Sequence, residues 1–154
     1  MAKVEESIEV EAPIRQVYNQ WTQFETFPQF MEHVETVSQV DDTHLHWKAT
    51  IAGKTEEWDA EVTEQHPDER VAWRSTSGSQ HAGVVTFHRI GDATTKVMLQ
   101  LDAEPHGVIE KIGDALGVLD REAKADLKRF KEYIESRGQE TGAYREDVSA
   151  PHQN

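Results

Sequence analysis

The sequence predicts an α+β fold in which a seven-stranded antiparallel sheet packs against one long C-terminal helix. Two observations lead to this fold class. Apolar residues alternate with polar ones in residues 3–11 and again from about 34 to 103, which is the period of half-buried strands. From Ile109 to Ile134 they recur at steps of three and four, which is typical of a helix with one apolar face.

The first strand and two short helices are expected in the N-terminal 31 residues. The alternation in residues 3–11 predicts a strand, which Ala12-Pro13 ends. Proline suits the first turn of a helix because its missing N–H has no partner there. Ile14 to Trp21 then follow helical spacing, and residues 24–31 predict a second short helix or tight loop around Pro28.

Six further strands are expected between residues 34 and 103. Each has one apolar and one polar face, which favours an antiparallel meander over a parallel sheet buried on both sides. The strands are separated by dipeptides typical of turns. These are Asp41-Asp42, Ala52-Gly53, Pro67-Asp68, Ser77-Gly78 and Gly91-Asp92.

The long helix is expected to span about 25–30 residues, because eight apolar residues form one stripe. They are Ile109, Ile112, Leu116, Leu119, Ala123, Leu127, Phe130 and Ile134. Arg137-Gly138 supplies a basic last turn and a stop. We therefore expect one domain over residues 1–137, followed by a polar and flexible tail over 138–154 in which Tyr144 alone offers a group that could pack back onto the domain.

Residues 11–31, EAPIRQVYNQWTQFETFPQFM, carry a family resemblance. The segment resembles the first helical segment of bacterial polyketide cyclase/dehydrase-like proteins and ubiquinone-binding proteins in the START-like (SRPBCC) superfamily. The resemblance extends from about residue 3 to 136. It implies the helix-grip (START/Bet v 1-like) fold, in which a curved sheet wraps around the long helix and leaves a cavity that two short helices close at one end. In that fold Pro28 would set the bend between the two short helices. Because the superfamily has many functions, it specifies the fold better than the activity.

Composition excludes several classes of partner. The chain has 16 Lys and Arg against 29 Asp and Glu, a net charge of −13, which repels phosphate backbones and disfavours nucleic acid. With no cysteine, the chain has no disulfide, zinc–thiolate site or thiol nucleophile. No apolar run approaches the ~20 residues of a membrane span, and the charged N-terminus does not match a signal peptide. We expect a cytoplasmic protein without stable membrane insertion.

The expected binding site is the cavity between the sheet and the long helix. Trp47, Trp58 and Trp73 lie on the apolar faces of three successive strands, where they could form a wall for a flat ligand or simply a tryptophan-rich core. Gly113 and Gly117 in the helix would give room either for a ligand or for close indole packing. The predicted cavity residues are Phe27, Phe30, Trp47, Trp58, Trp73, Val85, Phe87, Leu99, Ile112, Leu116 and Leu119.

No catalytic residue is assigned from the sequence, but Glu56 and His81 are candidates. Both fall on apolar strand faces, where a shifted pKa would suit acid or base chemistry on a carbonyl compound. The alternative is that each reaches water at a strand end, or that Glu56 pairs with Arg89. His44 and His46 have a spacing that can chelate a metal, but no third ligand is evident. We predict no metal site and no cofactor.

Three functions remain open. The first is binding of a hydrophobic polyketide-, quinone- or lipid-like small molecule in the internal cavity. The second is a polyketide cyclase, aromatase or dehydrase that acts on a ligand in the same cavity. The third is a protein-interaction module with a protein partner. Apolar walls specify the size and shape of a ligand but make few directional contacts, so the sequence does not identify the ligand.

Overall fold

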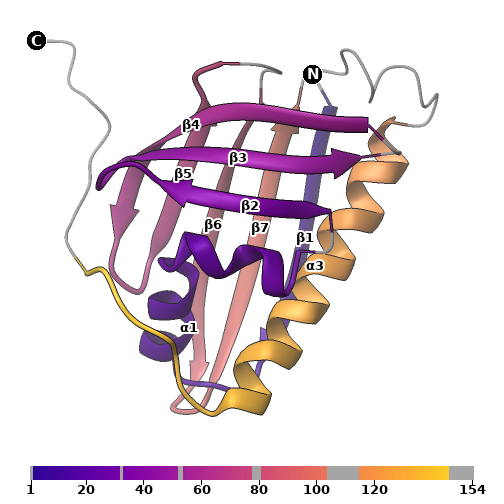
Figure 1. Cartoon of the computed structure of the whole chain (residues 1–154). Helices are drawn as coiled ribbons and strands as arrows, with labels where there is room; N and C mark the ends of the chain where they lie inside the picture. The colour runs from indigo at the N-terminus through magenta and orange to yellow at the C-terminus, as the bar shows by residue number, and fades with distance from the viewer. Residues whose placement is uncertain (1, 32, 52–53, 78–80, 104–114, 146–154) are drawn as a thin grey trace, which may run out of the picture.

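The computed structural model describes residues 2–31, 33–51, 54–77, 81–103 and 115–145. It contains seven strands, two α-helices and one 3₁₀-helix within these ranges (Figure 1). In chain order they are β1 (Ala2–Val10), α1 (Ile14–Trp21), η1 (Phe24–Gln29), β2 (Val34–Gln39), β3 (His44–Ile51), β4 (Lys54–His66), β5 (Arg70–Ser75), β6 (His81–Gly91), β7 (Thr94–Ala103) and α3 (Ala115–Arg137).

The strands form one curved antiparallel sheet in the order β1-β7-β6-β5-β4-β3-β2. Strands β1 and β2, which are consecutive in the sequence, therefore lie at opposite edges, and α1 and η1 connect them. Helix α3 packs along β1 and crosses the concave side of the sheet (Figure 1). This confirms the predicted helix-grip fold. The expected helix residues before Ala115 lie outside the described part of the chain.

The two short helices differ in detail from the prediction. The bend between them falls at Thr22 and Gln23, where the Gln23 backbone leaves the helical region at φ −92° and ψ 72°. Pro28, which was expected to set this bend, instead lies inside η1 near its C-terminal end. Pro28 has no N–H to donate, and the end of η1 is instead closed by the Phe30 and Met31 N–H groups, which donate to the carbonyl oxygen of Phe27 at 3.1 and 2.8 Å.

The hydrophobic core is continuous from the sheet to α3 and is densest where α1, η1 and α3 meet. Trp21, Phe30 and Phe130 are fully buried there. The Trp21 and Phe130 rings meet edge to face with centroids 4.9 Å apart, and the Phe30 and Phe130 rings do so at 5.2 Å. Trp21 and Phe30 therefore fix α1 and the end of η1 against α3.

A β-bulge in β4 changes which side chains face inward. The side chains of Trp58, Ala60 and Val62 face inward at every second position of β4. The β4–β5 register shifts between Val62 and Glu64, so the next side chain that faces inward is that of Gln65. Gln65 is buried, and its amide nitrogen donates to the backbone carbonyl oxygen of Tyr144 at 3.2 Å. The bulge thus presents a polar group to the C-terminal segment.

Residues 138–145, the first part of the expected tail, run back beside α1 (Figure 1). The Thr141 N–H donates to Gln20 Oε1 at 2.8 Å, and the Tyr144 N–H donates to Thr22 Oγ1 at 3.1 Å. Arg145 donates to Asn19 Oδ1 at 2.6 Å. The physical reason is that α1 buries amides and a hydroxyl as well as apolar side chains, and the tail supplies their hydrogen-bond partners.

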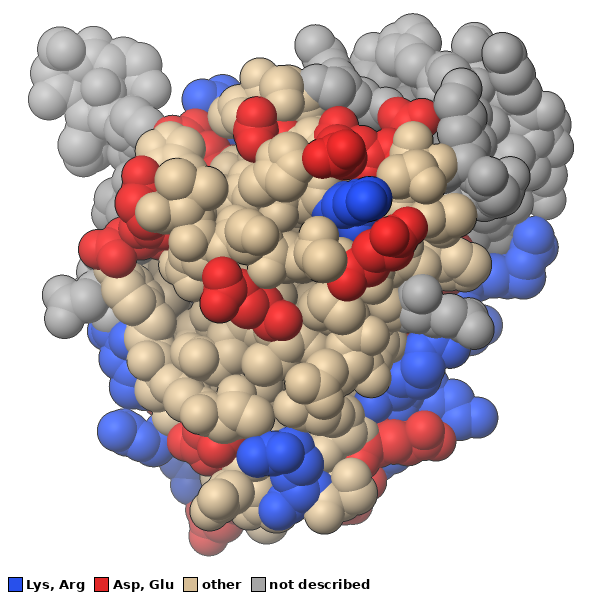
Figure 2. All heavy atoms as spheres, viewed as in Figure 1, with Lys and Arg blue, Asp and Glu red and all other residues tan. Residues whose placement is uncertain are grey.

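The negative net charge is not gathered into one block on the face seen in Figure 1. Figure 2 shows a broad area of uncharged residues at the centre of this face, with acidic and basic side chains around it. Among the helices that the structure describes, none combines the length and the apolar composition needed to cross a membrane.

Candidate functional site

A cavity of about 200 Å³ lies between η1, the middle strands of the sheet and α3, and is partly open to solvent. Its wall is almost entirely apolar, with aliphatic side chains such as Leu99, Leu101 and Leu127. Six aromatic residues also contribute to the wall. They are Trp21, Phe24, Phe27, Trp47, Trp58 and Trp73.

Two of the indoles that line the cavity are stacked on one another. Trp47 on β3 and Trp58 on β4 are direct cross-strand partners, and their rings stack with centroids 5.9 Å apart and an angle of 8° between the planes. Phe27 from η1 lies between Trp47 and Trp21, with ring centroids 5.6 Å from the first and 5.4 Å from the second. The strands and the short helix therefore both supply aromatic rings to the cavity wall, which suits an apolar molecule with rings of its own.

Three polar residues line one side of the cavity. His33, just before β2, approaches Glu122 on α3, with Nε2 and Oε2 2.5 Å apart, and its Nδ1 is 3.2 Å from the carbonyl oxygen of Thr50. Asp126, one turn further along α3, accepts from Arg129 Nη2 at 2.8 Å. Arg129 also donates from Nε to the carbonyl oxygen of Phe30 at 2.9 Å. These contacts join the β2 edge and η1 to α3.

The carboxyl group of Asp126 has a strongly shifted pKa. Burial raises its pKa from 3.8 to about 6, since a charge is poorly solvated beside an apolar cavity. The hydrogen bond and positive charge of Arg129 oppose this shift, and the negative charge of Glu122 adds to it. Asp126 therefore exchanges a proton near neutral pH at the edge of the cavity, which is the property required of an acid or base catalyst.

The structure brings five of the predicted cavity residues to the cavity: Phe27, Trp47, Trp58, Trp73 and Leu99. Phe30, Val85 and Phe87 are buried but do not line it. Phe30 packs against Phe130, and Phe87 packs against Tyr18 of α1 with ring centroids 5.4 Å apart. All three side chains belong to the hydrophobic core. Ile112 lies outside the described residues, as do the side chains of Leu116 and Leu119 on α3.

Neither catalytic candidate from the sequence is placed at the cavity. Glu56 pairs with Ala49 across β3 and β4, and its side chain is half-buried without lining the cavity wall. His81 begins β6, and its side chain lies outside the described part of the structure. The suggested pairing of Glu56 with Arg89 is wrong, because Arg89 forms an ion pair with Asp92 in the β6–β7 turn.

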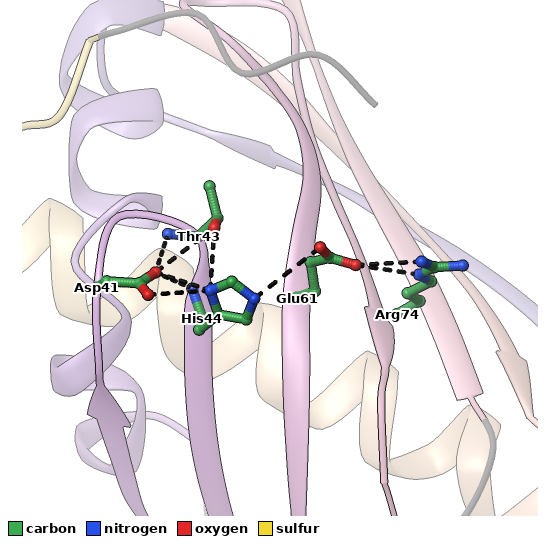
Figure 3. A network of polar contacts seen from close by, with 5 residues as sticks. All are labelled: Asp41, Thr43, His44, Glu61 and Arg74. Carbon is green, nitrogen blue, oxygen red and sulfur yellow. Dashed lines mark hydrogen bonds and ion pairs between the residues drawn. The ribbon is translucent and has the colours of Figure 1, made fainter. Parts of the chain in front are cut away.

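His44 and His46 lie on the convex face of the sheet, away from the cavity, and each contacts carboxylates. His44 Nδ1 is 2.8 Å from Asp41 Oδ1, and Figure 3 shows this contact continuing through Glu61 to Arg74. The hydrogen bond with Asp41 raises the pKa of His44. His46 lies between Asp59 and Glu57, whose hydrogen bonds raise its pKa. Within the described part of the chain, no set of three or more such side chains is arranged to hold a metal ion.

Sequence reasoning missed the polar side of the cavity. Asp126 lies three residues after Ala123 and four before Phe130, so helical spacing alone places it at the edge of the buried stripe. A carboxylate at such a position was therefore a detectable signal. His33 carried no such signal, because it lies in a short connection whose conformation is set by η1 and β2.

A seven-stranded sheet that grips a C-terminal helix over an apolar, aromatic cavity defines a START-like, helix-grip protein. Residues 10–132 match the family described as "Polyketide cyclase / dehydrase and lipid transport", and the chain belongs to that family.

Comparisons with individual proteins agree with this assignment. The chain is 60% identical over 146 residues to an uncharacterized 17.2 kDa protein in the melC2-rnhH intergenic region of Streptomyces lincolnensis, covering 94% of this chain and 97% of that one. A solved structure from Deinococcus radiodurans is 27% identical with a TM-score of 0.67, over 89% of this chain and 99% of the other. The Zhui aromatase/cyclase from Streptomyces sp. R1128 has a TM-score of 0.75 at 16% identity, over 92% and 98% of the two chains.

Proposed function

We propose that this protein binds a small, flat, hydrophobic molecule in the cavity between the sheet and α3. The observation that carries the proposal is the cavity itself, whose wall is apolar and includes the stacked Trp47 and Trp58 rings. A well-packed core leaves few voids larger than a water molecule, so a wide cavity lined by indoles requires an explanation. The family description, which includes cyclases, dehydrases and lipid transport, supports the same class of ligand.

The cavity size limits the ligand. Its volume of about 200 Å³ lies between the ~150 Å³ of a cavity that holds benzene and the ~300 Å³ at which drug-sized pockets begin. One or two fused rings fit this space, as does a ring-sized part of a longer polyketide-, quinone- or lipid-like molecule. A molecule of four fused rings would need the cavity to widen.

The test is a substitution that fills part of the cavity with a larger side chain. Ala49 lines the cavity, and Ala60 is equally buried but lies in the packed core. Ala49→Leu should abolish binding of tetralin, a two-ring hydrocarbon, with little loss of stability, because the added methylenes enter an existing space. Ala60→Leu, the matched control, should overpack the core at a cost of about 1–3 kcal/mol. Binding is measured by NMR titration and stability by urea unfolding. Parent protein that does not bind tetralin contradicts the proposal.

A second candidate is an enzyme of the cyclase or dehydrase type. The observation in its favour is Asp126, which lines the cavity and has a pKa of about 6. In this reaction the Asp126 carboxylate accepts an α-proton from a bound ketone, which becomes an enolate. The enolate carbon then bonds to a second carbonyl carbon of the same ligand, and the Asp126 carboxyl group gives its proton to the alkoxide oxygen that forms. The Zhui structure is an aromatase/cyclase by its name, and that activity is carried over here only as a proposal.

Hydrogen exchange tests this candidate without the natural substrate. In D₂O the protein should catalyse exchange of the α-protons of 1-tetralone, and Asp126→Asn should remove the catalysis while leaving 1-tetralone bound. Mass spectrometry follows deuterium incorporation, and NMR follows binding. Equal exchange rates in the presence of parent protein and variant would show that Asp126 is not a base for this chemistry.

A further inference from the structure

Residues 139–145, here called the C-terminal strap, follow α3 and lie along α1 (Figure 1). The strap begins after Gly138, where the chain turns away from α3 at a φ of 77°. None of its seven residues belongs to a helix or a strand, and its hydrogen bonds to the domain all involve a side chain. A segment held in this way opens more readily than the packed core, because it buries few apolar groups.

The strap supplies hydrogen-bond partners to two buried amides of α1. Asn19 donates from Nδ2 to Glu140 Oε2 at 2.8 Å and accepts at Oδ1 from Arg145 Nη1 at 2.6 Å. Gln20 donates from Nε2 to Thr141 Oγ1 at 3.1 Å and accepts the Thr141 N–H at Oε1 at 2.8 Å. Opening of the strap therefore replaces fixed partners with water at both amides.

The strap also covers the bend between α1 and η1. Thr22 Oγ1, at this bend, accepts the Tyr144 N–H at 3.1 Å. Gly142 lies so close to Gln23 that a Cβ atom on Gly142 would be 2.7 Å from Gln23 Oε1. Because Gln23 is the residue at which the backbone leaves the helical region, the strap holds the connection between the two short helices in place.

The same bend joins the parts of the cavity wall that α1 and η1 supply. Trp21 precedes the bend, Phe24 and Phe27 follow it, and all three residues line the cavity. Gln20 connects the two helices with the strap, because its Nε2 also donates to Thr26 Oγ1 of η1 at 3.2 Å. A ligand in the cavity and the strap on the other side therefore contact the same pair of short helices.

We propose that the C-terminal strap is a clamp that responds to occupation of the cavity: a bound ligand and the docked strap stabilise each other, because both hold the bend between α1 and η1. The loaded protein keeps the strap in place, and the empty protein opens it more often. A segment that one contact has already ordered costs less entropy to order for the second, which gives positive coupling without a large structural change. The coupling rests on the proposed binding of a ligand in the cavity and adds a means of regulating it.

Amide hydrogen exchange measures the opening of the strap in the full chain. The reporters are the N–H groups of Thr141 and Tyr144, whose acceptors are Gln20 Oε1 and Thr22 Oγ1. With free tetralin at about ten times its Kd, both should exchange severalfold more slowly, and about tenfold is the limit for a ligand that binds only the strap-docked form. NMR follows the exchange, and a tetralin titration of the same samples establishes binding.

Two other amides serve as controls. The Thr43 N–H also donates to a side chain, Asp41 Oδ1 at 2.9 Å, but in the exposed β2–β3 turn. Its exchange should not change when tetralin binds. Val97 is fully buried in β7, between β1 and β6, and its N–H reports unfolding of the whole domain. The strap amides should exchange faster than that of Val97, because the strap opens while the domain stays folded.

Gln20→Leu tests the connection between the strap and the two helices. The variant keeps a side chain of similar size and loses the amide. It should bind tetralin less tightly, because coupling is reciprocal, and bound tetralin should slow Tyr144 exchange less than in the parent protein. Gln16→Leu is the matched control, since it makes the same change one turn earlier on α1 at a half-buried position, and should behave like the parent.

The outcomes separate the clamp from the proposed function. If tetralin binds and the exchange of Thr141 and Tyr144 does not change, the strap is not coupled to the cavity, while hydrophobic binding stands. The clamp is also wrong if the strap amides exchange no faster than that of Val97. If tetralin does not bind, the proposed function fails and the clamp fails with it. Slower exchange that is confined to the strap, and is reduced in Gln20→Leu, supports both.

Discussion

The indole of Trp73 lies directly over Gly83, its cross-strand partner on β6. A Cβ atom on Gly83 would be 2.5 Å from Cζ2 of Trp73, which is closer than van der Waals contact allows. Glycine at this position is therefore what lets a large ring lie flat across the sheet and contribute to the cavity wall.

Gly83→Ala is expected to displace the Trp73 ring. The added Cβ would clash with carbon atoms of the rigid indole ring, which cannot bend away. The displacement of the ring should therefore reduce stability by about 1–3 kcal/mol and weaken tetralin binding. Gly91→Ala is the matched control, since a Cβ at Gly91 meets no atom within 4 Å. Urea unfolding and NMR titration measure the two effects. Equal stability of the two variants would show that Trp73 rearranges without loss.

The C-terminal segment is expected to stabilise the domain. Arg145 is 24% exposed in its ion pair with Asp68, at 2.9 Å, and its guanidinium also lies over the Tyr18 ring with a distance of 5.4 Å to the centroid. Arg145→Ala should lower the free energy of unfolding by about 1–2 kcal/mol. Arg89→Ala is the control, because Arg89 is 64% exposed beside Asp92, and such surface pairs contribute little.

Truncation provides a second measurement of the same contacts. A chain that ends after Gly138 loses the hydrogen bonds of residues 139–145 to α1, and should unfold at least 2 kcal/mol more easily than a chain that ends after Arg145. Thermal and urea unfolding of the two truncated chains give the difference. Identical stabilities would show that these contacts contribute nothing to the stability of the domain.

Asp126 is expected to make stability depend on pH. Its pKa is about 6 in the folded protein and ~3.9 in an unfolded chain, so between these values only the folded state holds the proton. Stability contributed by this group is therefore fully present below about pH 4 and is lost as the pH rises to about 6. Asp126→Asn removes the charge, and should be more stable than the parent at pH 7.5 by about 1–3 kcal/mol.

The comparison across pH isolates this group from the other carboxylates. The stability difference between Asp126→Asn and the parent should grow from pH 4 to about 6.5 and then remain constant. ¹³C NMR of the Asp126 carboxyl group measures its pKa directly. A stability difference that does not change with pH, or a titration near pH 4, would contradict the burial argument.

Two neighbouring residues on α3 should respond differently to truncation to alanine. Phe130 is packed on every side by Trp21, Phe30 and the rest of the core, so Phe130→Ala should destabilise by about 3–5 kcal/mol. Leu127 borders the cavity, so Leu127→Ala should cost less, about 2–3 kcal/mol, and should admit a three-ring probe such as phenanthrene. Urea unfolding and probe titration test both. Equal costs would show that the space beside Leu127 is not a cavity.

The fold was predictable because its pattern is local and repetitive. The inward sets of β3 to β5, such as Trp47, Trp58 and Trp73, follow directly from a period of two. Gln65 could not be placed this way, since a single-residue bulge shifts the phase of β4 without a sequence signal. The contacts of Arg145 could not be predicted from the sequence either, because they depend on which polar groups of α1 are buried once the chain has folded.

The candidate site was predictable in its walls but not in its polar contacts. Phe27 and Leu99 line the cavity as their positions implied, whereas Phe30 and Phe87 are packed against helices whose approach no strand pattern specifies. Asp126 was overlooked because a charged residue in a helix is usually solvent-exposed. Its importance depends on the neighbouring cavity and on Arg129, and both are tertiary features.

The pairing of β1 with β7 has a consequence for how the protein forms. Glu5 on β1 accepts a hydrogen bond from Gln100 on β7 at 2.6 Å, across 95 positions of the chain. A contact of such long range forms slowly, because the intervening chain loses entropy before the pair gains anything. During synthesis β1 therefore stays unpaired, with its apolar face exposed, until β7 and α3 have been made. Only a chain that already includes α3 can close the cavity, so a ligand can be enclosed only after α3 has been made.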